Sequence, residues 1–242
     1  MNIVGAYIFR DSLGRAIRAL SEMAGDIRPF SFSEDEAGKY GRGEVVDGVV
    51  SELFIKKNHA GFFLFSKSMR YNISLRNNSE IATIFVDSIV GDISFFLGAD
   101  ILRALSRGGL RFGFFCHNDE YIARNQYRTQ VGSSVINAWV GRDFPRYLPG
   151  LYWSTVVAKE EFFRLKINPD DLGAPFDGAG FPDEFIFYRF FEMADDWVKN
   201  KAILDERCRV TSGIFSILRI HQELALASKN FMQLSSILQQ WR

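Results

Sequence analysis

Residues 53–75 read LFIKKNHAGFFLFSKSMRYNISL and contain three short apolar runs separated by polar turns. The runs are Leu53–Lys56, Phe62–Phe65 and Met69–Leu75. Aromatic and branched residues bounded by Gly, Asn and Ser are typical of strands joined by turns. The stretch therefore predicts an antiparallel meander, which residues 81–86 would continue.

The residues on either side of this meander alternate between strand and helix patterns. Apolar residues recur at helical spacing in some segments and form short β-prone runs in others. The expected elements are strands over 2–9, 110–116 and 151–157, helices over 13–24 (capped by Ser12), 92–107 and 119–130 (capped by Asn118 or Asp119), and a short helix near 34–40 with Ser33 and Glu36 as a capping box. Residues 131–140 fit neither pattern.

The last third of the chain changes character. Residues 168–182 are rich in Pro and Gly and indicate a loop. Helices are expected over about 183–198 (capped by Asp183), 200–227 and 229–241. The sequence predicts an α+β fold, with an antiparallel sheet in the N-terminal two thirds and packed helices at the C-terminus. We expect a single domain over 1–242, helical from about residue 183.

Composition narrows the class of protein. Hydrophobic residues make up 47% and charged residues 24%, which are globular values. The 29 basic and 29 acidic residues balance, which argues against a general nucleic-acid binder. Two separated cysteines, Cys116 and Cys208, indicate free thiols in a reducing compartment, and a disulfide between them is the open alternative. No signal peptide and no apolar stretch long enough for a transmembrane helix are evident. We therefore expect a cytoplasmic protein that contacts neither nucleic acid nor membrane.

Charge is unevenly distributed along the chain. Segment 169–196 holds 8 acids and 1 base, whereas segment 102–149 holds 7 Arg and 3 acids. One interpretation is that the two segments neutralise each other or are solvated faces. The other is that the acidic segment, with its interleaved aromatic rings, binds a basic protein partner. The candidate partner-binding residues are Asp170, Asp171, Asp177, Phe181, Asp183, Glu184 and Tyr188.

Catalytic and metal-binding patterns are not evident. The three His residues are isolated and lack metal-ligand spacing, so we expect neither a metal nor a cofactor. Asp119 and Glu120 are adjacent acids that could serve acid–base chemistry, but at a helix N-terminus capping and the helix dipole also explain them. A small hydrolase using these two residues with Arg124 in a cleft remains an alternative, as does a non-catalytic scaffold. We expect a protein that is not an enzyme.

The centre of the chain carries a set of short motifs. A Glu-Tyr…Arg-Asn helix is followed by a Gly-Arg-Asp turn and by the segment PGLYW. Their residues are Glu120, Tyr121, Arg124, Asn125, Arg142, Asp143, Pro149, Gly150, Tyr152 and Trp153. This pattern resembles that of the Imm52-like family, immunity proteins of bacterial polymorphic toxin systems. The likeness covers about 40 of the 242 residues.

The resemblance implies a stoichiometric inhibitor that acts in interbacterial competition. Such an immunity protein binds a cognate toxin domain and protects the producing cell. The acidic segment 169–196 separately suggests that the toxin has a basic surface. It needs no cofactor, and a homo-oligomer is compatible with it. The motif residues have two open roles, which are to hold the fold together or to contact the toxin.

Overall fold

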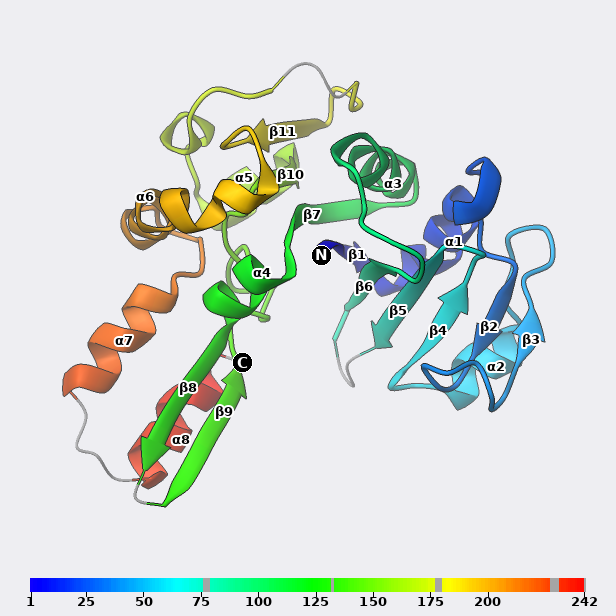
Figure 1. Ribbon diagram of the computed structural model, residues 1–242. Coiled ribbons are helices and arrows are strands. Elements are labelled where there is room, and N and C mark those ends of the chain that lie inside the picture. The colour runs from blue at the N-terminus through cyan, green and yellow to red at the C-terminus, as the bar shows by residue number, and fades with distance from the viewer. Residues whose placement is uncertain (76–78, 132, 177–179, 227–230, 242) are drawn as a thin grey trace. The chain divides into compact units, whose positions relative to one another are not determined.

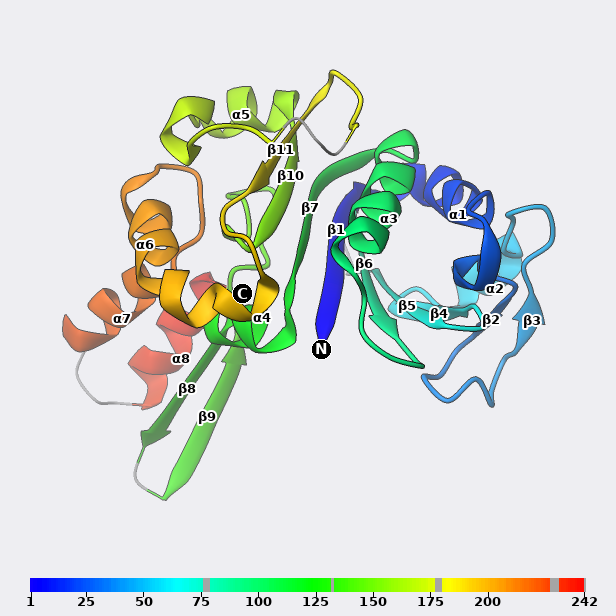
Figure 2. The same ribbon diagram turned by 45° about the horizontal axis from the view of Figure 1, so that its top comes forward.

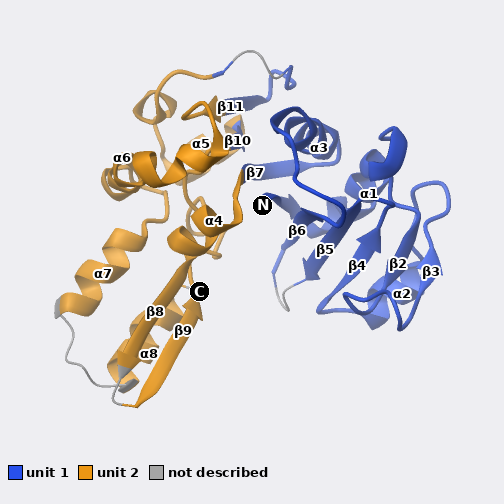
Figure 3. Ribbon diagram, viewed as in Figure 1, with its two compact units in different colours: residues 1–115, 155–158, 176–187 blue, residues 116–154, 159–175, 188–242 orange. Residues whose placement is uncertain are grey.

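The computed structural model describes residues 1–242 except 76–78, 132, 177–179, 227–230 and 242 (Figure 1). The fold is α+β, as predicted, with an antiparallel sheet in the N-terminal two thirds and helices towards the C-terminus. The chain divides into two compact units (Figure 3). Unit 1 comprises residues 1–115, 155–158 and 176–187, and unit 2 comprises the remainder. The prediction of one domain stays a prediction.

Unit 1 contains nearly all of a nine-stranded sheet with the order β11-β10-β7-β1-β6-β5-β4-β2-β3. The strands are β1 (Asn2–Phe9), β2 (Ser31–Ser33), β3 (Gly43–Glu44), β4 (Gly61–Phe65), β5 (Met69–Leu75), β6 (Ile81–Ser88), β7 (Leu110–His117), β10 (Ser154–Ala158) and β11 (Phe185–Arg189). Antiparallel pairing joins β1 to β6 and then continues through β5, β4 and β2 to β3. The predicted meander is thus confirmed from Gly61 onwards.

The described part of unit 1 contains five helices, of which α1 and α3 contribute most to its apolar core. The α-helices are α1 (Leu13–Ser21), α2 (Glu52–Lys57) and α3 (Phe95–Arg107). Two short 3-10 helices, labelled η, are η1 (Arg10–Ser12) and η2 (Gly25–Ile27). Helix α1 lies beside α3, and α3 contacts β1 (Figure 2). Ile17 and Leu20 of α1 and Leu102 and Leu105 of α3 are fully buried. The i, i+3 spacing within each pair places its two side chains on one face of the helix, as the sequence indicates.

Unit 2 combines a two-stranded sheet with most of the remaining helices. Its elements are α4 (Asn118–Asn125), β8 (Gln126–Val131), β9 (Ser134–Trp139), α5 (Lys159–Leu165), η3 (Pro169–Leu172), η5 (Ala194–Asp196), α6 (Trp197–Val210), α7 (Ile217–Leu226) and α8 (Phe231–Gln240). One face of the hairpin packs into a cluster that includes Tyr127, Ala138, Phe215, Ile220 and Leu238. The amide of Gly141 donates to the carbonyl of Trp241 over 2.7 Å, which ties the end of the hairpin to the segment after α8.

Two predictions in the N-terminal region are wrong. Leu53–Lys56 is not a strand but part of α2, where Glu52 in the first turn and two Lys in the last turn match the helix dipole. No helix forms at 34–40. The Asp35 carboxylate accepts bonds from the amides of Ala37 and Lys39, both at 2.9 Å, and this local bonding replaces a helix.

Further corrections concern where helices begin and end. The helix predicted over 119–130 ends at Asn125, and His117 rather than Asn118 or Asp119 is its N-cap. Ser12 precedes α1 but makes no capping bond, because its hydroxyl accepts from Arg15 instead. Strand β10 begins at Ser154 rather than at residue 151.

The helix predicted over 183–198 is also wrong. Its first part is strand β11, whose FIFYR sequence is β-prone, so Asp183 caps no helix there. Helices therefore begin with η5 at Ala194 rather than at about 183. The stretch 200–227 is divided by a turn between α6 and α7. The ambiguous stretch 131–140 contains β9, and α5 is an element that the sequence patterns did not predict.

Both cysteines, Cys116 and Cys208, are free and buried, as expected for free thiols. Among the described residues, no helix has the length and apolar character needed to cross a membrane.

Candidate functional site

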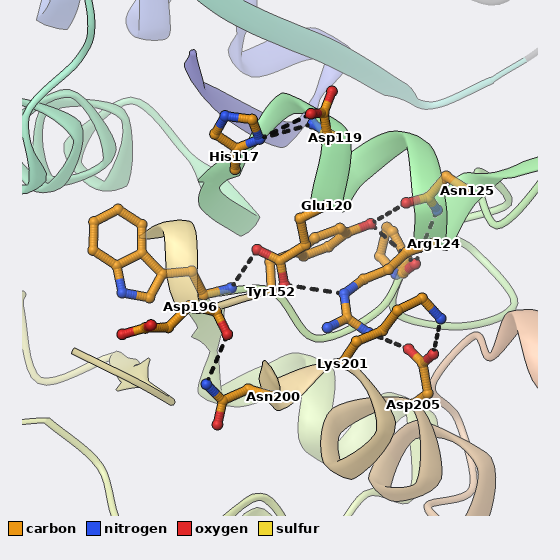
Figure 4. Close-up of polar contacts among 12 residues, drawn as sticks. His117, Asp119, Glu120, Arg124, Asn125, Tyr152, Asp196, Asn200, Lys201 and Asp205 are labelled. Carbon is orange, nitrogen blue, oxygen red and sulfur yellow. Dashed lines mark hydrogen bonds and ion pairs between the residues drawn. The ribbon is translucent and has the colours of Figure 1, made fainter. Parts of the chain in front are cut away.

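Helix α4 sets the geometry of a buried polar network in unit 2 (Figure 4). The helix starts directly after β7, where Nδ1 of His117 accepts a hydrogen bond from the amide of Asp119 over 3.2 Å. Asp119 is exposed, whereas the next residue, Glu120, is fully buried. Successive residues on a helix point about 100° apart. The two adjacent acids therefore do not form a carboxylate pair.

Glu120 is held by an arginine on the next turn and by a backbone amide. Its Oε1 accepts from Nε of Arg124 over 3.0 Å, and its Oε2 accepts from the amide of Trp153 over 3.2 Å (Figure 4). Arg124 also pairs through Nη1 with Asp205, and Lys201 pairs with the other oxygen of Asp205. These hydrogen bonds and ion pairs, made by two acids and two bases, connect helix α4 to helix α6 and to the segment before β10.

Burial determines the electrostatics of this network. It raises the pKa of Glu120 to about 7, against the opposing effect of Arg124. Burial also acts to lower the pKa of Arg124, but the carboxylates of Glu120 and Asp205 outweigh it and raise that pKa. The guanidinium therefore stays charged, and the carboxyl of Glu120 is the group that titrates near neutral pH.

A second part of the network surrounds Asn125. Its Oδ1 accepts from the hydroxyl of Tyr152 over 2.7 Å, and its Nδ2 donates to the carbonyls of Val140 and Pro149 at 3.2 and 3.3 Å. Gly141 has a φ of +74°, and a Cβ there would lie 2.7 Å from Nδ2 of Asn125. The amide of Asn125 thus joins the end of β9 to the PGLYW segment.

Aromatic rings complete this region. The rings of Tyr121 and Trp139 stack with centroids 5.4 Å apart, and the guanidinium of Arg142 lies 4.4 Å from the centre of the Trp139 ring. Arg142 also donates to the Tyr121 hydroxyl over 3.2 Å. The indole of Trp153 donates to the carbonyl of Phe191 over 2.8 Å.

The structure therefore brings the predicted motif residues together. All ten lie in unit 2. Glu120, Tyr121, Arg124, Asn125, Pro149, Gly150, Tyr152 and Trp153 are buried, and only Arg142 and Asp143 are half-buried. Residues that are buried and bonded to other residues of the same chain usually stabilise the fold.

The candidate partner-binding residues do not share one unit. Asp170, Asp171 and Tyr188 belong to unit 2, whereas Phe181, Asp183 and Glu184 belong to unit 1. Asp177 lies outside the described residues. The four described acids are exposed. Among the residues that the structure describes, none of these four carboxylates forms an ion pair.

The aromatic candidates differ from the acids. The Phe181 ring is half-buried and stacks on Phe187 with centroids 5.0 Å apart. Tyr188 is only 1% exposed, and its hydroxyl donates to the carbonyl of Pro169 over 3.3 Å. Burial raises the pKa of Tyr188 to about 12. The ring of Tyr188 therefore belongs to the interior.

Sequence reasoning missed three members of the network, Lys201, Asp205 and Trp139. Lys201 and Asp205 are spaced as an i, i+4 pair on α6, which is a usable local signal. The contact between Asp205 and Arg124, by contrast, spans 81 residues of sequence. Within the described parts of the chain, no cluster of three or more His, Cys, Asp or Glu could hold a metal ion.

Cys116 precedes the network but is not placed as a nucleophile. It is fully buried, and burial, reinforced by the charge of Glu120, raises the pKa of its thiol well above the usual value. A thiol that resists ionisation in an apolar setting is unreactive.

A comparison of the chain with protein-family models, curated proteins and solved structures finds no significant match.

Proposed function

We propose that this chain is an immunity-type protein that neutralises a cognate antibacterial toxin by stoichiometric binding. The observation that supports this most directly is the set of exposed carboxylates at Asp170, Asp171, Asp183 and Glu184, which lack ion-pair partners within the described chain. Acids that were already neutralised by the chain's own arginines would have little charge left for a partner. Unpaired surface carboxylates increase the rate of association with a basic protein.

The buried network supports the same proposal indirectly. Glu120 and Arg124 are 0% and 4% exposed and are occupied by each other, by Asp205 and by a backbone amide. A hydrolase would need these groups to reach a substrate, together with Asp119. Because Asp119 is exposed and Glu120 is enclosed, the geometry favours a binding protein over that alternative.

The test is co-expression with the protein encoded beside this chain. We expect a complex that contains the two proteins in a 1:1 ratio on multi-angle light scattering, and restored growth of cells that produce the neighbouring protein. The absence of both a complex and restored growth would remove the proposal. A complex without any toxicity of the neighbour would instead indicate a scaffold.

Charge-reversal variants then test the acidic residues. Asp170→Lys with Asp171→Lys changes unit 2, and Asp183→Lys with Glu184→Lys changes unit 1. The matched control is Glu22→Lys with Glu44→Lys, two other exposed acids that form no ion pair in the described chain. We expect at least one candidate pair to lower the association rate about tenfold or more at low salt, and the control to change it little. Equal effects of all three pairs would show only a dependence on net charge.

A further inference from the structure

The outer edge of β9 is an unpaired strand edge. Among the described residues, strands β8 and β9 pair antiparallel only with each other and form a separate two-stranded sheet (Figure 1). The amide of Val140 donates to the carbonyl of Asn125 over 2.8 Å, which fixes the residues that exchange bonds across the hairpin. Because bonded pairs alternate with non-bonded pairs, every second residue of β9 directs its amide and carbonyl outwards. These residues are Val135, Asn137 and Trp139.

This edge lacks the features that protect sheet edges in proteins. Short length, charged side chains and proline are the usual protection. The edge strand β3 of the nine-stranded sheet is two residues long, contains Glu44 and directly follows Arg42. At the other end of that sheet, β11 includes Arg189. Strand β9, by contrast, has six residues, SVINAW, without a charge or a proline.

Two of the three side chains along the β9 edge are exposed, and the third is held by its neighbours. Val135 is 55% exposed and Asn137 is also exposed. The ring of Trp139 is fixed by its stacking on Tyr121 and by the guanidinium of Arg142. An edge that is held in place before binding loses less conformational entropy when a partner strand adds to it.

We propose that β9 pairs antiparallel with β9 of a second copy of this chain, about a two-fold axis at Asn137. In that register Asn137 faces its own counterpart, and Val135 of each copy faces Trp139 of the other. All three residues present outward amides and carbonyls, so each pair forms the bonded type of contact. The two hairpins become one four-stranded sheet.

Side-chain chemistry favours this partner and this edge. An Asn amide both donates and accepts, so two facing amides are complementary, and an apolar residue opposite an aromatic ring is a favourable cross-strand pair. The same two-fold pairing centred on β8 would set Arg128 against Arg128, and facing like charges are destabilising. The inference is independent of any toxin, and its failure would leave the proposed function untouched.

The first test is a pair of proline variants examined by sedimentation velocity over a range of concentrations. Asn137→Pro removes an amide on the β9 edge, and Arg128→Pro removes one on the β8 edge. Neither amide is used within the hairpin, so both variants should fold, as far-UV circular dichroism would check. We expect wild type and Arg128→Pro to form dimers as concentration rises and Asn137→Pro to stay monomeric. A monomeric wild type, or an Asn137→Pro dimer as stable as that of wild type, would overturn the proposal.

The second test is chemical and does not depend on a destabilising substitution. Asn137→Cys would place two thiols opposite each other across the two-fold axis, at a separation that a disulfide can bridge. We expect mild oxidation to give a disulfide-linked dimer of Asn137→Cys but not of Arg128→Cys. Cys116 and Cys208 are buried and will not compete. Equal cross-linking of both variants, or of neither, would count against the β9 pairing.

Discussion

The two units bury different kinds of polar side chain. In the described part of unit 1 the buried polar residues are hydroxyl-bearing, namely Ser12, Ser21, Ser31, Ser33, Ser66, Ser88, Ser106 and Thr155. Unit 2 buries three hydroxyl residues too, but also Glu120, Arg124, Asn125, Glu161 and Asp205. A buried hydroxyl is satisfied by one nearby carbonyl, as Ser21 is by that of Ile17 over 2.9 Å. A buried charged side chain strongly destabilises the fold when its ion-pair partner is removed.

This difference gives the units different sensitivities. The interior of unit 1 depends on apolar packing, which tolerates volume-conserving exchange. The interior of unit 2 depends on specific donors and acceptors, so single substitutions and changes of pH should affect it more. All four tryptophans, Trp139, Trp153, Trp197 and Trp241, lie in unit 2. Tryptophan fluorescence therefore reports on the surroundings of residues in unit 2.

The largest effect is expected from Arg124→Met. The change leaves the carboxylates of Glu120 and Asp205 buried without their shared guanidinium. Breaking a buried ion pair in this way should lower the free energy of unfolding by about 3–5 kcal/mol. Urea unfolding followed by tryptophan fluorescence measures it. Arg128→Met, an exposed arginine on β8, is the control and should cost less than about 0.5 kcal/mol. Equal costs would show that the network does not stabilise unit 2.

The second effect is a dependence of unit 2 stability on pH. The pKa of Glu120 rises on folding from its ordinary value of 4.5 to about 7, because burial disfavours the ionised form. The folded state therefore binds this proton more tightly than the unfolded state. Stability contributed by this group is full below about pH 4.5 and is lost as pH rises to about 7, a change on the order of 3 kcal/mol.

The variant Glu120→Gln isolates that contribution. It cannot ionise, so the decline in stability between about pH 5 and pH 7.5 should be largely removed, as measured by urea unfolding across that range. Asp119→Asn, the exposed neighbour, should keep the decline. If Glu120→Gln shows the same pH profile as wild type, the titrating group lies elsewhere.

The smallest change in stability is expected from replacing one glycine in each unit by alanine. Gly141 has a φ of +74°, and a Cβ there would lie 2.4 Å from Cδ1 of Phe215. Gly141→Ala should therefore cost about 1–3 kcal/mol. Gly14 lies in α1, and a Cβ added there would have no neighbouring atom within 4 Å. Gly14→Ala should raise helix stability by about 0.5–1 kcal/mol. Thermal unfolding followed by circular dichroism separates the two, and a loss of stability in both variants would contradict the comparison.

Local patterns are sufficient for much of the fold. The period of apolar residues predicts β1, β5, β7 and α3 to within a few residues. Such patterns fail where a short apolar run fits two structures. Leu53–Lys56 looks like a strand by composition, but the charges around it specify helix α2. Residues 185–189 follow acids that resemble a helix cap, although the residues themselves form a strand.

The candidate site shows a different limit. The sequence identifies the motif residues but not the contacts that explain them. Tyr152 and Asn125 are 27 residues apart, and Arg124 and Asp205 are 81 apart. Periodicity describes which face of an element is apolar, and it carries no information about which buried acid meets which buried base. The division of the acidic segment between two units is unpredictable for the same reason.

The bond between Gly141 and Trp241 has a consequence for how the protein is made. A ribosome synthesises the hairpin about a hundred residues before Trp241 and, at about 5–20 residues per second, roughly 5–20 seconds earlier. During that interval the face of the hairpin that carries Tyr127 has neither α7 nor α8 to cover it. Unit 2 therefore cannot be completed until Trp241 has been synthesised, and the apolar face of the hairpin stays uncovered until α7 and α8 have followed it.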